Sequence, residues 1–393
     1  MFAWELGNGL GHASRLRRIA ARLRPHGVRT IAVVKDVPTV VPADEAFDQI
    51  EAAPIWPYHQ RPVAERRPLP SATMNDMLSA LGLVDLEAVQ RLLAEWDEIF
   101  NRLRPDLIVA DYSPLTALAA RRRIPLALVG TGFTVPPDQM PRFPLLHRLS
   151  PPAFDEGQTL ATVNTAATSL GLSQLERLPE LFSGDACLAQ CFQLLDPYDT
   201  QRISPVEGPV FEELPIPRAT DAERVFVYLS SDGTQSPSIH ESLVTVAKRL
   251  RLHAPLWPKA SLDQLAGAGA CLDAVPQSLA SILASSRLVI HHGGNGVAAE
   301  ALAAGVPQLV LSRHIEQDLN GEAIERAGAG RLIKPHELAT RLEPNLIQSM
   351  IDDDTMAARA AALGGRLREL TAQRDALLNC EAVCMGLLKG NSA

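Results

Sequence analysis

The sequence predicts an α/β protein built from two doubly wound domains. Short apolar runs alternate with amphipathic helical patterns in both halves of the 393 residues. A stretch rich in proline and acidic residues, 204–223, separates the two halves. Runs that are apolar on both faces are typical of parallel strands covered by helices on each side. Alternation of such strands with helices favours doubly wound sheets.

Six apolar runs have the length and composition of buried strands, and residues 1–4 resemble the beginning of another. Apolar residues recur at helical spacing between the runs, most clearly over 16–23 and 86–103, and again over 297–304 and 363–377. The predicted strands are 30–34, 106–112, 125–130, 224–231, 287–292 and 307–312.

The same pattern gives the predicted domain boundaries. We expect an N-terminal Rossmann-like domain over 1–205, a linker over 206–222, a C-terminal Rossmann-like domain over 223–375 and a C-terminal helix over 376–393. The proline-rich stretch 136–160 is expected to be a loop beside the site of the first domain.

Composition narrows the classes of partner. A net charge of −8 argues against nucleic acid as a partner, because duplex-binding domains are strongly basic. No run approaches the roughly 18 apolar residues of a transmembrane segment. Arginine-rich stretches such as 15–24 are expected to be solvated helix faces, which leaves peripheral contact with an anionic membrane open. Five cysteines without metal-ligand spacing are expected to be buried or partly buried thiols that act as small apolar groups, in a cytoplasmic protein.

The segment "HHGGNGVAAEALAAGVPQLVLSRHIEQDLN", residues 291–320, is the most informative one. It follows a predicted strand, turns through glycines and enters a helix, so backbone N–H groups gather at the carboxyl edge of a sheet. Such a helix N-terminus favours an anion such as a diphosphate. His292 is placed to donate a hydrogen bond to it, and Glu316 and Gln317 follow the next strand, where they can bind sugar or ribose hydroxyls.

This segment resembles the donor-binding signature of GT-B nucleotide-diphospho-sugar glycosyltransferases of the UDP-glycosyltransferase type, in its bacterial form. The matching residues are His292, Gly294, Glu300, Gly305-Val306-Pro307, Glu316-Gln317 and Asn320. The resemblance implies two Rossmann-like domains that face each other across a cleft, and a nucleotide-diphospho-sugar as co-substrate without a further cofactor. It implies a diphosphate site of His292, Gly293, Gly294, Asn295 and Gly296, a ribose contact from Glu300, and sugar contacts from Glu316 and Gln317.

Two other stretches of the second half resemble parts of the same family. "VPQSL" resembles the loop that contacts the base, with Gln277 as the candidate, and "VYLSSDGT" resembles the first strand and loop of the donor domain. Ser230 of that loop is a further candidate for diphosphate binding. Asp232 stands where the family has glycine, and an acid facing a diphosphate would be unfavourable.

The opening "GNGLGH" has the glycines of a dinucleotide-binding loop, but His12 stands where the third glycine of that fingerprint would fall. "GHASR" instead resembles the Gly-His-x-x-[Pro/Arg] turn of the glycosyltransferases. There the histidine is the general base that deprotonates the acceptor hydroxyl, with inversion at the sugar carbon, and Asp111 matches its orienting carboxylate. A helix cap is the alternative for each residue. Gly130, Thr131 and Phe133 are candidates for the acceptor pocket, or for a plain turn.

The sequence therefore predicts an inverting hexosyltransferase that uses no metal and acts on a small-molecule or lipid acceptor. Two alternatives stay open: a nucleotide-sugar hydrolase or epimerase on the same fold, because those relatives also carry arginine where Arg15 stands, and a non-catalytic nucleotide-sugar-binding protein, because of Asp232. The residues do not distinguish a UDP-sugar from a dTDP-sugar.

Overall fold

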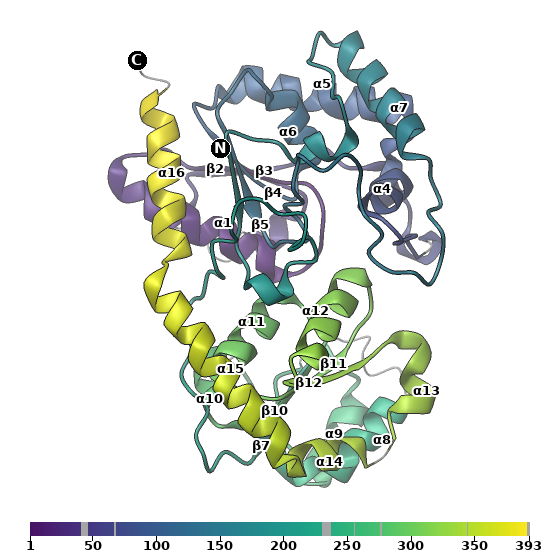
Figure 1. Cartoon of the computed structure of the whole chain (residues 1–393), viewed down its shortest axis with the longest axis vertical. Helices are drawn as coiled ribbons and strands as arrows, with labels where there is room; N and C mark the ends of the chain where they lie inside the picture. Colours follow the sequence, from purple (N-terminus) through teal and green to yellow (C-terminus); the bar gives the residue numbers. More distant parts are fainter. Residues whose placement is uncertain are drawn as a thin grey trace. The chain divides into compact units, whose positions relative to one another are not determined.

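A computed structural model gives the fold of the chain and describes residues 1–40, 46–66, 68–229, 237–254, 256–275, 277–343 and 345–390. The chain divides into two compact units, which are described separately here. Unit 1 contains residues 1–210 and 375–393, and unit 2 contains residues 211–374 (Figure 1).

Unit 1 is built on a parallel sheet of six strands in the order β3-β2-β1-β4-β5-β6. Every neighbouring pair in this sheet is parallel, with β1 between β2 and β4. The chain order therefore reverses between β1 and β4, which makes this pair of strands the topological switch point. The strands are β1 (Phe2–Trp4), β2 (Ile31–Val34), β3 (Gln49–Ala52), β4 (Ile108–Asp111), β5 (Leu126–Gly130) and β6 (Ala186–Ala189).

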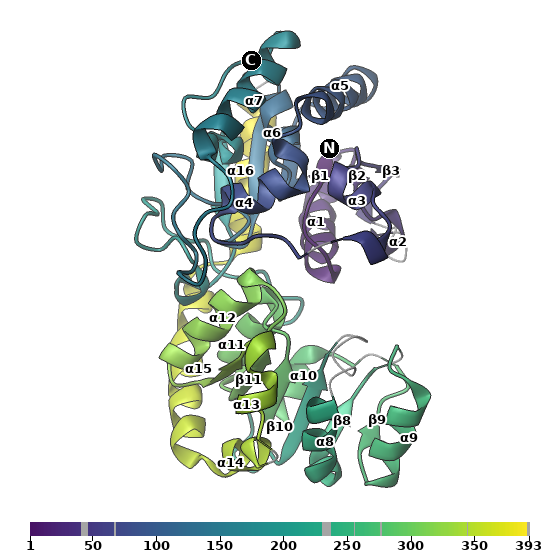
Figure 2. The same cartoon turned by 90° about the vertical axis from the view of Figure 1, so that its right-hand side faces the viewer.

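Helices cover the sheet of unit 1, whose inner strands β1, β2, β4 and β5 are buried along their whole length. Alternate strand residues form one buried cluster with α1 and α16, while α6 contacts β4 and β5 and packs against α5. Figure 2 shows α5, α6 and α7 grouped together. The helices are α1 (Leu10–Leu23), α2 (Val37–Val40), α3 (Pro57–Gln60), α4 (Met74–Leu78), α5 (Leu86–Leu103), α6 (Pro114–Ala120), α7 (Glu156–Ser169) and α16 (Ala376–Gly390).

Unit 2 repeats the same topology, with six parallel strands in the order β12-β11-β10-β7-β8-β9. The switch point lies here between β7 and β10. Phe226 and Val289 pack with α10 and α11, whereas Val225, Val227, Leu288 and Ile290 belong to the cluster on the other face. The strands are β7 (Arg224–Tyr228), β8 (Leu250–Leu252), β9 (Cys271–Leu272), β10 (Ser286–His291), β11 (Gln308–Leu311) and β12 (Gly330–Ile333).

The helices of unit 2 connect these strands and continue toward the chain end. Of those that follow the last strand, α15 packs along α11. They are α8 (Pro237–Thr245), α9 (Lys259–Gly267), α10 (Leu279–Ala284), α11 (Asn295–Ala304), α12 (Ile315–Arg326), α13 (Leu338–Arg341), α14 (Leu346–Asp352) and α15 (Asp354–Gln373). In the described ranges no helix is both long and apolar enough to cross a membrane.

Three sequence expectations need correction. The single C-terminal helical stretch over 363–377 is two helices, α15 and α16, with a break at Arg374. The irregular segment 136–160 is shorter, since Asp155 accepts a hydrogen bond from the backbone N–H of Gln158 and caps α7 from Glu156 onward. Not every thiol is buried, because Cys271 on β9 is exposed.

A buried carboxylate fixes the segment that follows the end of β4. Glu5 accepts hydrogen bonds from Trp56 Nε1 at 3.2 Å, Leu115 N at 3.2 Å, and both the backbone N and Oγ1 of Thr116 at 2.6 Å. These bonds occupy the N-terminus of α6, directly after Asp111 in the chain. Burial outweighs the bonds and raises the pKa of Glu5 to about 7.

Glu5→Ala should destabilise unit 1 by about 2 kcal/mol or more, because it leaves four buried donors without their acceptor. Folding raises the pKa of Glu5, so the folded state binds a proton more tightly than the unfolded chain does. The resulting stabilisation is complete below about pH 4.5 and is lost as the pH rises through about 7. The cost of the substitution should therefore be larger at pH 5 than at pH 7.5. Urea unfolding followed by tryptophan fluorescence would check this. Equal free energies of unfolding for variant and wild type would contradict it.

Candidate active site

The first predicted pair meets at the switch point of unit 1. His12 lies in the first turn of α1, which follows β1, and Asp111 is the last residue of β4. Because β1 and β4 are neighbours, with Trp4 opposite Asp111, the two side chains converge at the carboxyl edge of the sheet. His12 Nδ1 lies 2.9 Å from Asp111 Oδ1. The structure thus brings together two residues that are 99 positions apart in sequence.

The charge state of Asp111 decides which nitrogen of His12 carries the proton. Burial alone would raise the pKa of this fully buried carboxyl, but the charges of His12 and Arg15 and their hydrogen bonds hold it below its usual value. An ionised carboxylate only accepts hydrogen bonds, so Nδ1 must carry the shared proton. The neutral ring then has its lone pair on Nε2, as a general base requires.

Gly7 leaves the space beside that nitrogen. A Cβ at position 7 would lie 2.3 Å from His12 Nε2, and Gly7 has φ +83°, a conformation that disfavours side chains. Lys35 Nζ donates a hydrogen bond of 2.6 Å to the carbonyl oxygen of Gly7 and so fixes this loop. Burial lowers the pKa of Lys35 to about 8. The glycine of the opening loop therefore keeps the face of Nε2 open.

Aromatic rings surround the imidazole. The ring centroid of His12 lies 5.2 Å from that of Trp4 and 6.4 Å from that of Tyr112, with nearly parallel planes in both pairs. Tyr112 directly follows Asp111 and has φ +47°, an uncommon backbone conformation for a residue with a side chain. This turn positions Tyr112 beside His12. No motif in the sequence pointed to either aromatic residue.

The three candidates for the acceptor pocket are all buried at the end of β5. The ring centroid of Phe133 lies 6.4 Å from that of Tyr112, and the Tyr112 ring in turn stacks on His12. Thr131 is engaged locally, since its backbone N donates to Thr134 Oγ1 at 2.9 Å. Gly130 ends β5, and a Cβ there would lie 3.4 Å from Asp111 Oδ1. Of the three, Gly130 lies beside Asp111, and all three expose little surface, so their contact with an acceptor stays a prediction.

A pocket of about 560 Å³ lies in the proline-rich segment of unit 1. Phe143 lines it and contacts Phe182 at 6.1 Å, and Phe182 in turn contacts Tyr112 at 6.4 Å. Ring contacts thus connect the pocket to His12. The apolar part of its wall includes Met140, Phe143, Leu145 and Phe154. Polar and charged side chains also line it, namely Thr73, Asn75, Arg142, Asp155, Glu156 and Gln201. The many prolines of 136–152 were the only sequence signal for it.

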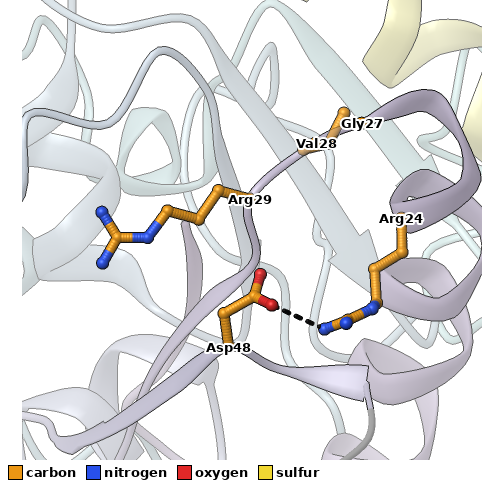
Figure 3. A pocket seen from close by; sticks show the side chains of 5 residues that line it. All are labelled: Arg24, Gly27, Val28, Arg29 and Asp48. Carbon is orange, nitrogen blue, oxygen red and sulfur yellow. Dashed lines mark hydrogen bonds and ion pairs between the residues drawn. The ribbon is translucent and has the colours of Figure 1, made fainter.

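A second pocket, of about 460 Å³, lies at the end of the arginine-rich α1. Figure 3 shows its lining, in which Arg24 pairs with Asp48 at 2.9 Å while Arg29 extends away from that pair. Arg29 donates to Gln49 Oε1 instead. Arg24 and Arg29 bind nearby residues of unit 1, and none of the predicted site residues lines this pocket.

The predicted diphosphate loop occupies the switch point of unit 2. It runs from His292, after β10, to the start of α11, whose N-cap is Gly294. The first helical residues after Gly294, Asn295 and Gly296, present backbone N–H groups that the helix itself does not use. His292 Nδ1 contacts the carbonyl oxygen of Leu311 at 2.9 Å, so Nδ1 carries a proton. Ser230 and Asp232 lie outside the described residues.

Gly293 differs from its neighbours because its backbone is already bound. Its N–H donates to Nδ1 of the buried His291 at 3.0 Å, and its carbonyl oxygen accepts from Asn320 Nδ2 at 2.9 Å. With φ +88°, it has no room for a Cβ, which would lie 2.7 Å from Val310 Cγ1 and 3.0 Å from the carbonyl oxygen of Gln317. Gly293 therefore shapes the loop, and its N–H is not available to an anion in this conformation.

The other donor-site candidates lie at the same edge of the unit 2 sheet or next to it. Glu316 and Gln317 are in the first turn of α12, beside Gly293, and Gln317 Oε1 accepts from the backbone N of Arg313 at 2.8 Å. Glu300 is half-buried in α11 and raises the pKa of Tyr228, at the end of β7, in addition to the larger effect of burial. Gln277 is exposed and donates weakly to the carbonyl oxygen of Val275.

Sequence reasoning treated His291 as structural, and its contacts add a role in shaping the loop. Burial lowers its pKa to about 4, so the ring is neutral above pH 5. Nδ1 accepts from Gly293, and Nε2 therefore carries the proton and donates to Gln308 Oε1 at 2.8 Å. Of the two histidines in "HHGG", the buried His291 therefore holds the loop through the Gly293 N–H, and His292 is partly exposed.

His291→Leu should weaken binding of a nucleoside diphosphate about tenfold or more, because it removes the acceptor for the Gly293 N–H. His291→Asn is the matched control, since a short carboxamide oxygen can accept from the N–H two residues on. Calorimetric titration with dTDP and UDP would measure both variants. Equal dissociation constants for the leucine variant and the wild type would contradict this role.

Comparison with known proteins finds a family model that is similar to part of unit 2. Residues 241–372 match the family described as erythromycin biosynthesis protein CIII-like, C-terminal domain. The matched region extends from α8 into α15 and includes the whole loop from His291 to Asn320, whereas Ser230 precedes it.

Longer alignments with curated relatives extend the similarity beyond residues 241–372. A PGL/p-HBAD biosynthesis rhamnosyltransferase of Mycobacterium bovis is 27% identical over 302 residues, which cover 67% of this chain and 64% of that protein. This chain thus matches somewhat less than two thirds of that relative's length. The elloramycin glycosyltransferase ElmGT of Streptomyces olivaceus is 27% identical over 332 residues, 80% of this chain and 76% of ElmGT.

A solved structure confirms the fold. The spinosyn rhamnosyltransferase SpnG, complexed with thymidine diphosphate, superimposes with a TM-score of 0.63 at 18% identity, covering 93% of this chain and 95% of SpnG. The α/β GT-B architecture and the resemblance to bacterial antibiotic-type glycosyltransferases are therefore confirmed.

Proposed function

We propose that this protein is a glycosyltransferase that moves a sugar from a nucleoside-diphosphate donor to an acceptor hydroxyl. The single observation that carries the proposal is the His12–Asp111 pair at the switch point of unit 1. Both sheets have the order in which ligands bind at the carboxyl edge between the central strands. The relatives are rhamnosyl- and glycosyltransferases, which supports the same reaction class.

In the proposed reaction His12 is the general base. Nε2 takes the proton of the acceptor hydroxyl while that oxygen bonds to the anomeric carbon of the sugar. The bond from that carbon to the diphosphate oxygen breaks, and its electron pair leaves with the nucleoside diphosphate. Attack on the face opposite the leaving group inverts the anomeric carbon. Asp111 orients His12 through Nδ1 and stabilises the imidazolium that forms.

Unit 2 would bind the donor. The N–H groups at the start of α11, at Asn295 and Gly296, supply positive potential for the leaving diphosphate without a metal ion or a resident cofactor. His292 adds a hydrogen bond from Nε2 when its ring is protonated, since Nδ1 already binds Leu311. Glu300 would bind the ribose and Gln277 the base, and Glu316 and Gln317 the sugar. The complex of SpnG with thymidine diphosphate favours dTDP-sugars as the first donors to try.

The acceptor would be a small molecule or lipid with an apolar body. The pocket around Met140 and Phe143 supports this class, because much of its wall is apolar and it lies in the same unit as His12. Gly130, Thr131 and Phe133 would border the bound hydroxyl.

The test is consumption of dTDP-rhamnose, dTDP-glucose and UDP-glucose with and without a panel of phenolic and aliphatic alcohols, with EDTA present. Acceptor-dependent formation of a glycoside supports the proposal. Free sugar or an epimer formed without acceptor would instead indicate the hydrolase or epimerase. Tight donor binding without consumption across the panel would indicate a non-catalytic binding protein.

A further inference from the structure

A third charged residue belongs to the His12–Asp111 pair. Arg15 lies three residues after His12 in α1, so both side chains project from the same face of the helix. Arg15 Nη1 donates a hydrogen bond of 2.6 Å to Asp111 Oδ2, while His12 occupies Oδ1 at 2.9 Å. Each carboxylate oxygen therefore has its own donor, and the two donors come from one helix.

The burial of these groups makes the contact specific. The side chain of Asp111 is fully buried, and those of His12 and Arg15 are each 12% exposed. A cation at this depth needs a partner, and Asp111 is the only carboxylate that it pairs with among the residues that the structure describes. Lys35 Nζ binds the carbonyl oxygen of Gly7, the residue whose Cβ would meet His12 Nε2. The arginine is thus not part of the solvated face that the sequence predicted for α1.

We propose that Arg15 is a positioning residue that locks the Asp111 carboxylate, so that Oδ1 always accepts the Nδ1 proton of His12. Without the second donor, the carboxylate can rotate and its hold on Nδ1 weakens. The imidazole then distributes its proton between Nδ1 and Nε2, and the molecules that carry it on Nε2 have no base directed toward the acceptor. Arg15 therefore acts through Asp111 on the tautomer of His12, and it touches neither the sugar nor the acceptor.

This role also accounts for the arginine in the "GHASR" turn. The sequence left a hydrolase or epimerase open because such relatives carry arginine at this position. In the structure the guanidinium of Arg15 binds the carboxylate of Asp111. The arginine is therefore also compatible with a transferase, in which it would support deprotonation of the acceptor hydroxyl by His12.

The direct test is the tautomer of His12, measured by ¹⁵N NMR on protein labelled at histidine, with the signals assigned by comparison with His12→Ala. In the wild type we expect the Nδ1–H tautomer and a low-field Nδ1 proton. Arg15→Met should give a mixture of tautomers and lose that proton signal. Arg22→Met, an exposed residue of the same helix, is the control and should match the wild type. A wild-type tautomer in Arg15→Met would overturn the proposal.

Arg15→Lys keeps the charge with a single ammonium donor and should give an intermediate tautomer ratio. It decides the matter if Arg15→Met fails to fold: a partial shift supports the proposal, and an unchanged spectrum overturns it. A kinetic measurement rests on the proposed function. There Arg15→Met should lower kcat about 10- to 100-fold with little change in KM. Absence of transfer by the wild type would contradict the proposed function, whereas the NMR result would still decide the role of Arg15.

Discussion

His12→Ala is expected to lower transfer by about 10²- to 10⁴-fold, the contribution of a positioned general base. The variant lacks the imidazole whose Nδ1 lies 2.9 Å from Asp111 Oδ1 and whose Nε2 is the proposed base. Binding of the nucleoside diphosphate should not change, because its predicted site lies in unit 2. Initial rates with a saturating donor and titration calorimetry with dTDP measure the two quantities separately.

His26→Ala is the matched control for this substitution. His26 follows α1 in the same unit, is exposed and pairs with Glu381 at 2.7 Å. Its loss should leave transfer within about twofold of the wild type, as is usual for an exposed ion pair. Undiminished transfer by His12→Ala would remove the assignment of the base, and equal loss of dTDP binding would show that the variant is damaged beyond its site.

Gly7→Ala is expected to abolish transfer almost as fully as loss of the base. The new Cβ would lie 2.3 Å from His12 Nε2, so it occupies the position from which an acceptor hydroxyl must approach, or displaces the imidazole. The substitution also places a side chain at φ +83°, which costs about 1–2 kcal/mol of stability. The rate of transfer and the free energy of unfolding should be measured on the same preparation.

Gly9→Ala separates the two effects of that substitution. Gly9 lies in the same loop with φ +91°, but a Cβ there meets no atom within 4 Å. It should therefore cost similar stability while it retains most of the transfer activity. Equal loss of transfer in both variants would mean that loop strain, rather than access to Nε2, explains the effect.

Much of the fold was predictable because its strands are buried on both faces. The six predicted runs correspond to β2, β4, β5, β7, β10 and β11, and residues 1–4 contain β1. The sequence missed β3, β6, β8, β9 and β12, which lie away from the switch points. Of these, β3 reads "QIEA" and is too polar for a hydrophobic pattern, whereas β9 has two residues and is too short for one.

The predicted site depended on motifs, and its contacts depended on tertiary structure. His12 and Asp111 could be chosen from their positions at a helix start and a strand end. Nothing in the sequence indicated that Arg15 would bind the same carboxylate, since arginines at 17, 18, 22 and 24 follow the same pattern. His291 can accept from the Gly293 N–H through Nδ1 because its Nε2 proton is bound by Gln308. That contact depends on the pairing of β10 with β11, which places Gln308 opposite Val289.

The most direct test of the central claim is the configuration of the product. The protein should be incubated with dTDP-rhamnose or dTDP-glucose and an alcohol acceptor from the panel, and the anomeric carbon of the glycoside observed by NMR. The His12–Asp111 base predicts a glycoside whose anomeric configuration is opposite to that of the donor. A glycoside with the configuration of the donor, or free sugar formed without any acceptor, would contradict the account.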